Sequence, residues 1–195
     1  MSQREDLERF AALILKWNAV QNLVSRETVD QLWPRHIEDS LQLMTHLREG
    51  DRRVIDIGSG GGFPAIPMAI ASRGTDRSFT LVEPVTKKAA FLRTAARELD
   101  LPITVFAGRA EDFDSRETAE LVTSRALAAL PKLLGLALPL ASPKAHFLFP
   151  KGRNYRQELD AAAALYHFDV VIHPSESDPE GVILDIENLR DKSAV

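Results

Sequence analysis

The sequence has 195 residues, and none of them is a cysteine. This absence excludes a disulfide framework, a thiolate zinc site and a cysteine nucleophile. Long apolar runs are also missing, because prolines, a lysine and a glycine interrupt the longest one, residues 126–142. No apolar segment follows the first methionine, and the histidines lack metal-ligand spacing. We therefore expect a cytoplasmic protein with no metal site and no membrane partner.

Acidic side chains outnumber basic ones, and the formal net charge is −4. The imbalance is uneven along the chain. Residues 51–153 hold 15 basic and 11 acidic side chains, whereas residues 154–195 hold 3 basic and 9 acidic ones. This distribution permits a basic, nucleic-acid-binding face in the middle of the chain and gives the C-terminal tail an acidic character.

The first 50 residues have the pattern of helices. Ser2 and Glu5 have capping-box spacing. Apolar residues then recur every three or four positions as far as Trp17. A second helix is expected from about Asp30 to Leu47. We therefore divide the single globular unit into an N-terminal helical extension, residues 1–50, and a main domain, residues 51–195.

Residues 51–195 alternate between short apolar runs and helical patterns, which predicts an α/β fold with a doubly wound, mainly parallel sheet. Ligands of such sheets bind beyond the carboxyl ends of the strands. The turn-like stretch 174–180 lets the last two strands pair antiparallel. The predicted strands are 53–57, 79–83, 103–106, 121–124, 145–149, 168–172 and 182–186, and the predicted helices are 65–72, 86–99, 127–138 and 155–166.

A glycine-rich loop follows the first predicted strand and reads Gly58-Ser-Gly-Gly-Gly-Phe-Pro64. Glycines let a ligand approach the backbone, and the next helix points free N–H groups towards it. Glu83, at the end of the next strand, can accept hydrogen bonds from both hydroxyls of a ribose. Strand, loop, helix and acid together indicate a cofactor that contains a nucleoside.

The spacing of the glycines favours S-adenosylmethionine over a dinucleotide. The dinucleotide fingerprint fails at Phe63 when it is counted from Gly58, and a later register is disturbed by prolines. The pattern Asp-x-Gly-x-Gly-x-Gly, which is typical of S-adenosylmethionine enzymes, fits Asp56, Gly58, Gly60 and Gly62. A dinucleotide and a ligand-free glycine turn remain the alternatives.

A second loop of interest, residues 108–113, is acidic and follows the third predicted strand. In a doubly wound sheet this loop neighbours the one after Glu83, so its backbone and a carboxylate can hold an adenine. An acidic surface turn is the alternative interpretation.

The chain resembles the bacterial ribosomal RNA small subunit methyltransferase G family, also called glucose-inhibited division protein B. The similarity covers roughly residues 17–152 and includes several motifs outside the cofactor loop. These motifs are Trp17-Asn18, Asn22-Leu23, Arg35-His36-Ile37 with Asp39-Ser40, residues 56–64, Arg109-Ala110-Glu111, Ser124-Arg125-Ala126 and Lys151-Gly152.

The resemblance implies a Rossmann-like class I S-adenosylmethionine-dependent methyltransferase fold and methylation of guanine N7 in 16S ribosomal RNA. The RNA substrate is expected within a small-subunit particle, and no oligomer is predicted. The implied cofactor contacts are Asp56, Gly58, Gly60, Gly62, Phe63, Glu83, Ala110, Glu111 and Arg125. The implied RNA contacts are Arg35, His36, Arg125, Lys151 and Arg153. We expect Arg35, Lys151 and Arg153 to converge near the mouth of the cofactor pocket.

The proposed chemistry needs no general base, because guanine N7 carries a lone pair and no proton. The sequence has no obvious base beside the glycine loop, and His36 is interpreted as a contact between a helix and the main domain. Catalysis would depend on alignment and desolvation. Three alternatives remain: a small-molecule methyltransferase, a non-catalytic nucleotide- or RNA-binding module, and an NAD-linked oxidoreductase.

Overall fold

The computed structural model describes residues 2–25, 27–114 and 118–193, and this part of the chain forms one sheet of seven strands. The strand order is β3-β2-β1-β4-β5-β7-β6. Neighbouring strands run parallel except β7, which is antiparallel to β5 and β6. The predicted doubly wound sheet and its antiparallel C-terminal strand are therefore confirmed. The strands are β1 Arg53–Ile57, β2 Ser78–Val82, β3 Ile103–Phe106, β4 Ala119–Thr123, β5 Ala141–Lys151, β6 Tyr166–Pro174 and β7 Val182–Asp191.

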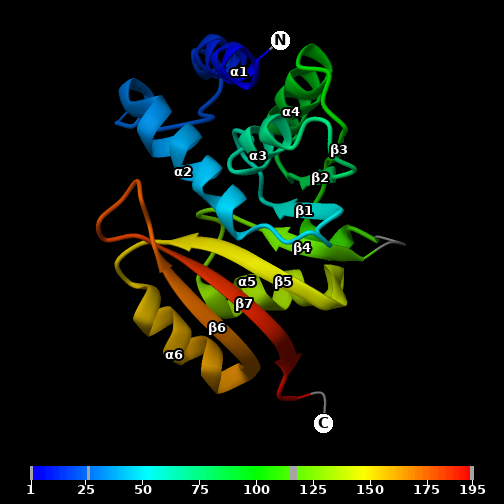
Figure 1. Cartoon of the computed structure of the whole chain (residues 1–195), viewed down its shortest axis with the longest axis vertical. Coiled ribbons are helices and arrows are strands. Elements are labelled where there is room, and N and C mark those ends of the chain that lie inside the picture. The colour runs from blue at the N-terminus through cyan, green and yellow to red at the C-terminus, as the bar shows by residue number, and fades with distance from the viewer. Residues whose placement is uncertain (1, 26, 115–117, 194–195) are drawn as a thin grey trace.

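Helices cover both faces of the sheet (Figure 1). Strand β1 shows why: Val54 packs into the cluster that contains α1, α3 and α4, whereas Ile55 and Ile57 pack into the cluster that contains α5 and α6. A strand buried on both faces has a nearly continuous apolar sequence, and β1 follows this pattern at Val54, Ile55 and Ile57. The α-helices are α1 Gln3–Asn18, α2 Asp39–Leu41, α3 Ala65–Ala71, α4 Thr86–Glu98, α5 Leu130–Ala137 and α6 Tyr155–Leu165.

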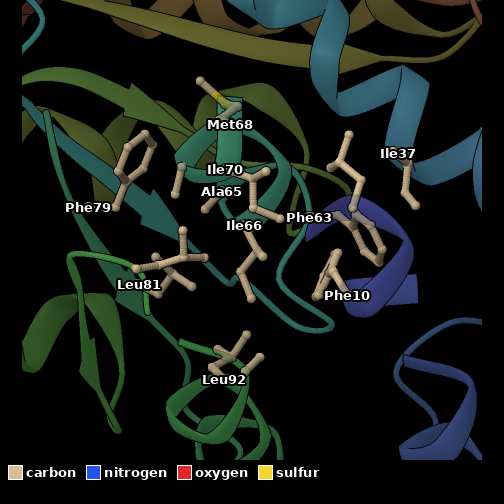
Figure 2. Packing of buried hydrophobic residues seen from close by; sticks show 14 of the residues in the cluster. Phe10, Ile37, Phe63, Ala65, Ile66, Met68, Ile70, Phe79, Leu81 and Leu92 are labelled. Atoms are coloured by element: carbon tan, nitrogen blue, oxygen red, sulfur yellow. The ribbon is translucent and has the colours of Figure 1, made fainter. Parts of the chain in front are cut away.

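The N-terminal helix shares a hydrophobic core with the main domain. The expected capping box is present, because Ser2 Oγ accepts from Glu5 N–H at 3.3 Å and Glu5 Oε2 accepts from Ser2 N–H at 2.7 Å. Phe10 of α1 packs against Phe63 of the glycine loop, with ring centroids 5.2 Å apart (Figure 2). The extension therefore helps to hold the glycine loop in place.

The helix expected from Asp30 to Leu47 is helical over most of its length but is not one α-helix. It consists of a 3₁₀ turn at Val29–Gln31, a π-helical turn at Trp33–Glu38, α2, and a second 3₁₀ turn at Gln42–His46. Pro34 lacks an N–H group for the regular α-helical ladder and lies at the start of the π-helical turn. Such turns occur often at functional sites, and this one carries Arg35 and His36.

Helix α5 begins at Leu130, three residues later than the sequence pattern predicts. Pro131 explains the difference, because proline is tolerated in the first turn of a helix but not in its interior. Residues 124–129 therefore form a connecting segment after β4. Ala126 in this segment has a φ of 55°, in the left-handed region that alanine seldom adopts.

The last three strands are longer than predicted, because their cross-strand pairing extends beyond the apolar runs. In the described residues no helix combines the length and hydrophobicity needed to span a bilayer.

Candidate functional site

The glycine loop lies between the end of β1 and the start of α3, at the point where the strand order reverses. Gly58 and Gly62 have φ values of 71° and 90°, which favour glycine over residues with a side chain. A Cβ on Gly58 would also lie only 2.6 Å from Leu127 Cδ1. The positive φ therefore favours glycine at position 58, and a Cβ there would also displace the Leu127 side chain.

Glu83 joins the glycine loop to the loop after β2. Its side chain is buried, with one oxygen accepting from Gly60 N–H at 2.8 Å and the other from Val85 N–H at 2.7 Å. A carboxylate has about four lone-pair sites, so each oxygen can accept a further hydrogen bond. Glu83 therefore orders two loops and retains acceptor capacity for a ligand.

A cavity of about 370 Å³ lies beside these loops and is called the smaller cavity here. Its volume falls within the range of small-molecule sites. Gly58, Ala110 and Glu111 line it as the sequence predicts, and Leu127 and Lys132 also line it although sequence reasoning did not select them. The complete lining is Ile57, Gly58, Val82, Pro84, Val85, Arg109, Ala110, Glu111, Leu127, Ala128, Lys132 and Leu136.

Five of the predicted cofactor contacts line neither the smaller cavity nor the larger one described below: Asp56, Gly60, Gly62, Phe63 and Glu83. Asp56 is buried; its Oδ1 accepts from Thr123 Oγ1 at 2.8 Å, and its Oδ2 has no hydrogen-bond partner. Burial raises the pKa of the Asp56 carboxyl to about 7. Phe63 belongs to the hydrophobic core, so the geometry gives Asp56 and Phe63 a supporting position.

A cavity of about 660 Å³, the larger cavity, lies on the other side of residues 127–128, which line both cavities. It is built from four segments that are distant in sequence. Arg35 and His36 come from the first segment, Arg125 from the second, Lys151 from the third and Ser177 from the fourth. The complete lining is residues 23–25, 28, 35, 36, 39, 125–129, 150–152, 158, 175, 177, 178, 181 and 182.

Arg125 lines the larger cavity, and its guanidinium is held by the N-terminal segment. Its Nη1 donates to the Arg35 carbonyl oxygen and to Asp39 Oδ2, both at 3.0 Å, and its Nη2 donates to His36 Nδ1. The guanidinium also lies 5.2 Å from the centroid of the Phe63 ring. These contacts place Arg125 on the larger cavity rather than among the residues that line the smaller one.

Both ring nitrogens of His36 already have partners. Nδ1 accepts from Arg125, and Nε2 lies 2.9 Å from Thr28 Oγ1. Burial, together with the adjacent Arg125 guanidinium, lowers the pKa of His36 to about 4. At neutral pH the imidazole is therefore uncharged, with its acceptor nitrogen occupied by Arg125.

Arg35, Arg125 and Lys151, all expected to contact RNA, line the larger cavity together, but Lys151, like Arg125, has its charge paired within the protein. Arg35 and Arg153 line a hollow of about 490 Å³ next to the larger cavity. The Lys151 ammonium is buried and donates at 2.8 Å to both Glu158 Oε2 and the Ala128 carbonyl oxygen. This pairing argues against our expectation that Lys151 offers a free charge to phosphate, and it indicates that Lys151 positions residues 127–129.

Among the described residues no cluster of three or more side chains has the arrangement of a metal site.

The sequence model of the GidB family, described as rRNA small subunit methyltransferase G, matches residues 3–177 of the chain. The chain belongs to this family. Curated family relatives named ribosomal RNA small subunit methyltransferase G include one from Cereibacter sphaeroides, which is 46% identical over 187 residues, covering 95% of this chain and 90% of the relative. Another, from Gluconobacter oxydans, is 46% identical over 186 residues, covering 95% and 94%.

Solved structures place this family member in a wider fold group. An O-methyltransferase from Bacillus cereus in complex with SAH matches with a TM-score of 0.61 and 17% identity, covering 92% of this chain and 91% of that one. A glycopeptide N-methyltransferase in complex with S-adenosylmethionine matches with a TM-score of 0.64 and 13% identity, covering 78% and 93%. At these identities the likeness shows the class I methyltransferase fold alone.

Proposed function

We propose that this protein transfers the methyl group of S-adenosylmethionine to N7 of one guanine in 16S ribosomal RNA. The proposal rests on family membership across residues 3–177 and, in the structure, on two cavities that share one wall. We assign the smaller cavity to the cofactor and the larger one to the RNA. The expected location is the cytoplasm, and the expected substrate is the RNA within a small-subunit particle.

The residues of the smaller cavity fit the chemistry of this cofactor. Gly58 leaves the backbone open at the end of β1, and a Cβ there would meet Leu127. Glu83 does not itself line the cavity, but it lies between Val82 and Pro84, which do, and we assign its remaining acceptor capacity to the two ribose hydroxyls. Ala110, Val85 and Leu136 provide an apolar surface for adenine, and Glu111 provides an acceptor for its amino group. When bound, the sulfonium of the cofactor supplies an electrophilic methyl group.

The larger cavity has to align a base and exclude water, because N7 carries no proton to remove. Such alignment can supply roughly 7–11 kcal/mol in favourable cases. Arg125 faces this cavity and can donate to guanine O6, next to N7, which fixes the base without blocking its lone pair. We assign phosphate contacts to the Arg35 and Arg153 side chains alone, because the rest of the hollow that they line carries the carboxylates of Glu158, Asp178 and Glu180.

We expect the methyl-transfer rate to be flat between about pH 6 and pH 8. The pKa of His36 is lowered to about 4, so the imidazole stays neutral over this whole interval. The pKa of Asp56 is about 7, but this residue lines neither cavity and is not expected to contact the reacting groups. Single-turnover rates at saturating cofactor and RNA measure the chemical step. A tenfold decrease towards pH 6 in the native protein that disappears in His36→Gln would instead identify His36 as a base.

Mapping of methylated guanines by mass spectrometry tests the function directly. Small-subunit RNA from a strain lacking the protein should lose one methyl group at one guanine, and the purified protein with S-adenosylmethionine should restore it. Restoration should be faster on small-subunit particles than on naked RNA. An unchanged guanine pattern would favour the small-molecule methyltransferase or the non-catalytic module.

A further inference from the structure

The loop between β6 and β7, residues 174–181, forms one wall of the larger cavity. Ser175, Ser177, Asp178 and Gly181 all line it. Two backbone hydrogen bonds shape the loop, from Ser175 N–H to the Gly181 carbonyl at 3.0 Å and from Gly181 N–H to the Asp178 carbonyl at 2.9 Å. The sequence pattern identified this loop only as a turn, yet it lines the same cavity as Arg125.

Asp39 connects this loop to Arg125. Its Oδ2 accepts from Arg125 Nη1 at 3.0 Å. Its Oδ1 accepts from Ser177 Oγ at 2.5 Å and from Gln42 Nε2 at 2.8 Å. Arg125 comes from the end of β4 and Ser177 from the C-terminal hairpin, so one carboxylate of the N-terminal segment joins two distant parts of the site.

Gln42 strengthens the same connection. It is buried, its Oε1 accepts from Glu176 N–H at 2.8 Å, and its Nε2 lies 3.2 Å from both Ser175 Oγ and Ser177 Oγ. The loop backbone and its serine hydroxyls are therefore fixed relative to Asp39. A shift of the Arg125 guanidinium would be transmitted through Asp39 to the loop.

The charge of the loop indicates what it contacts. Asp178 faces the larger cavity, and Asp178 and Glu180 line the adjoining hollow beside Arg35 and Arg153. Carboxylates repel phosphate but accept hydrogen bonds from the N–H groups of a base. The Watson–Crick edge of guanine presents such donors at N1 and N2. The chemistry of this wall therefore suits a base edge rather than the RNA backbone.

We propose that Asp39 is a positioning residue, which makes Arg125 and the loop of residues 174–181 act as one unit in orienting the target guanine. This inference rests on the proposed function, because it assigns roles within the same RNA-binding cavity. The role assigned to Asp39 is to hold its partners, because its two oxygens accept from Arg125, Ser177 and Gln42.

A double-mutant cycle tests whether Ser177 and Arg125 are connected through Asp39. Ser177→Ala should lower kcat/KM for small-subunit particles about fivefold or more in the native background, through a higher KM. In an Arg125→Met background, the same change should cost less than about twofold, because methionine cannot donate to Asp39 and the link is already broken. The affinity for S-adenosylmethionine should stay unchanged in Ser177→Ala, and the loss should be similar at low and high salt, since no phosphate contact is removed.

A matched control comes from Thr94→Ala on α4, whose hydroxyl contacts only a carbonyl of its own helix among the described residues. This variant should leave kcat/KM unchanged in both backgrounds. Asp39→Asn should reproduce the KM effect of Ser177→Ala. Losses for Ser177→Ala and Arg125→Met that simply multiply would overturn the coupling. Failure of the native protein to methylate ribosomal RNA would instead overturn the proposed function.

Discussion

Replacing Glu83 with alanine is expected to weaken the binding of S-adenosylmethionine by roughly a hundredfold or more. Two charge-assisted hydrogen bonds to ribose hydroxyls would be lost, each contributing about 1.5–3 kcal/mol, and tenfold in affinity corresponds to about 1.4 kcal/mol. The structure adds a second reason. The alanine variant also leaves Gly60 N–H and Val85 N–H without their acceptor, so both loops lose their common support.

Calorimetric titration with the cofactor measures this effect, and thermal unfolding shows whether the variant is folded. Glu83→Gln separates the two contributions, because a glutamine keeps one acceptor oxygen of similar position but loses the charge. Glu98→Ala, at the exposed end of α4, serves as the control and should bind normally. A folded Glu83→Ala protein with native cofactor affinity would remove Glu83 from the cofactor site.

Replacing His146 with alanine is expected to lower the free energy of unfolding by about 3–5 kcal/mol, because it removes the partner of two carboxylates in the interior. The His146 imidazole is buried, with Nε2 at 3.0 Å from Asp51 Oδ2 and Nδ1 at 3.0 Å from Asp185 Oδ1. Each ring nitrogen faces a carboxylate oxygen, which is an acceptor. The ring can donate to both carboxylates only when both of its nitrogens carry a proton. Burial alone would lower the pKa of His146, but the hydrogen bonds to Asp185 and Asp51 outweigh it and raise the pKa above 6.5.

The raised pKa gives this contribution a defined dependence on pH. A group that binds its proton more tightly when folded adds stability below its unfolded pKa, near 6.5, and loses it as the pH rises through the folded pKa. Urea unfolding at pH 6 and at pH 9 should therefore show a loss of stability in the native protein that is smaller in His146→Ala. The exposed His167 on β6 provides the control. Equal unfolding free energies for the native protein and His146→Ala at pH 6 would contradict the charged arrangement.

The sequence is sufficient to predict the sheet and the glycine loop, because both depend on local patterns. Apolar runs predict buried strands, and glycines at alternate positions predict backbone with positive φ. The division of residues 29–46 into four short helical turns could not be predicted in the same way. Pro34 and the packing of this segment decide where each turn begins, and neither changes the spacing of the apolar residues. The start of α5 was within reach, since Pro131 limits where that helix can begin.

The larger cavity could be predicted only in part, because its charges are paired across long distances in sequence. Arg125 is 86 residues from Asp39, and Ser177 is 138 residues from it. Motif spacing selected Arg125 and Arg35 but gave no information about their partners. Lys151 was assigned to RNA for the same reason: its pairing with Glu158 depends on how α6 folds back after β5.

Leu127 and Ala128 line both cavities, so the two sites share atoms. An occupant of the smaller cavity that displaces Leu127 from Gly58 also changes the shape of the larger one. Such coupling is reciprocal by thermodynamic necessity: if bound cofactor raises the affinity for RNA by some factor, bound RNA raises the affinity for cofactor by the same factor. The same relation applies to product release. The cofactor loses its sulfonium charge on transfer, so the affinity for the methylated RNA would change with it.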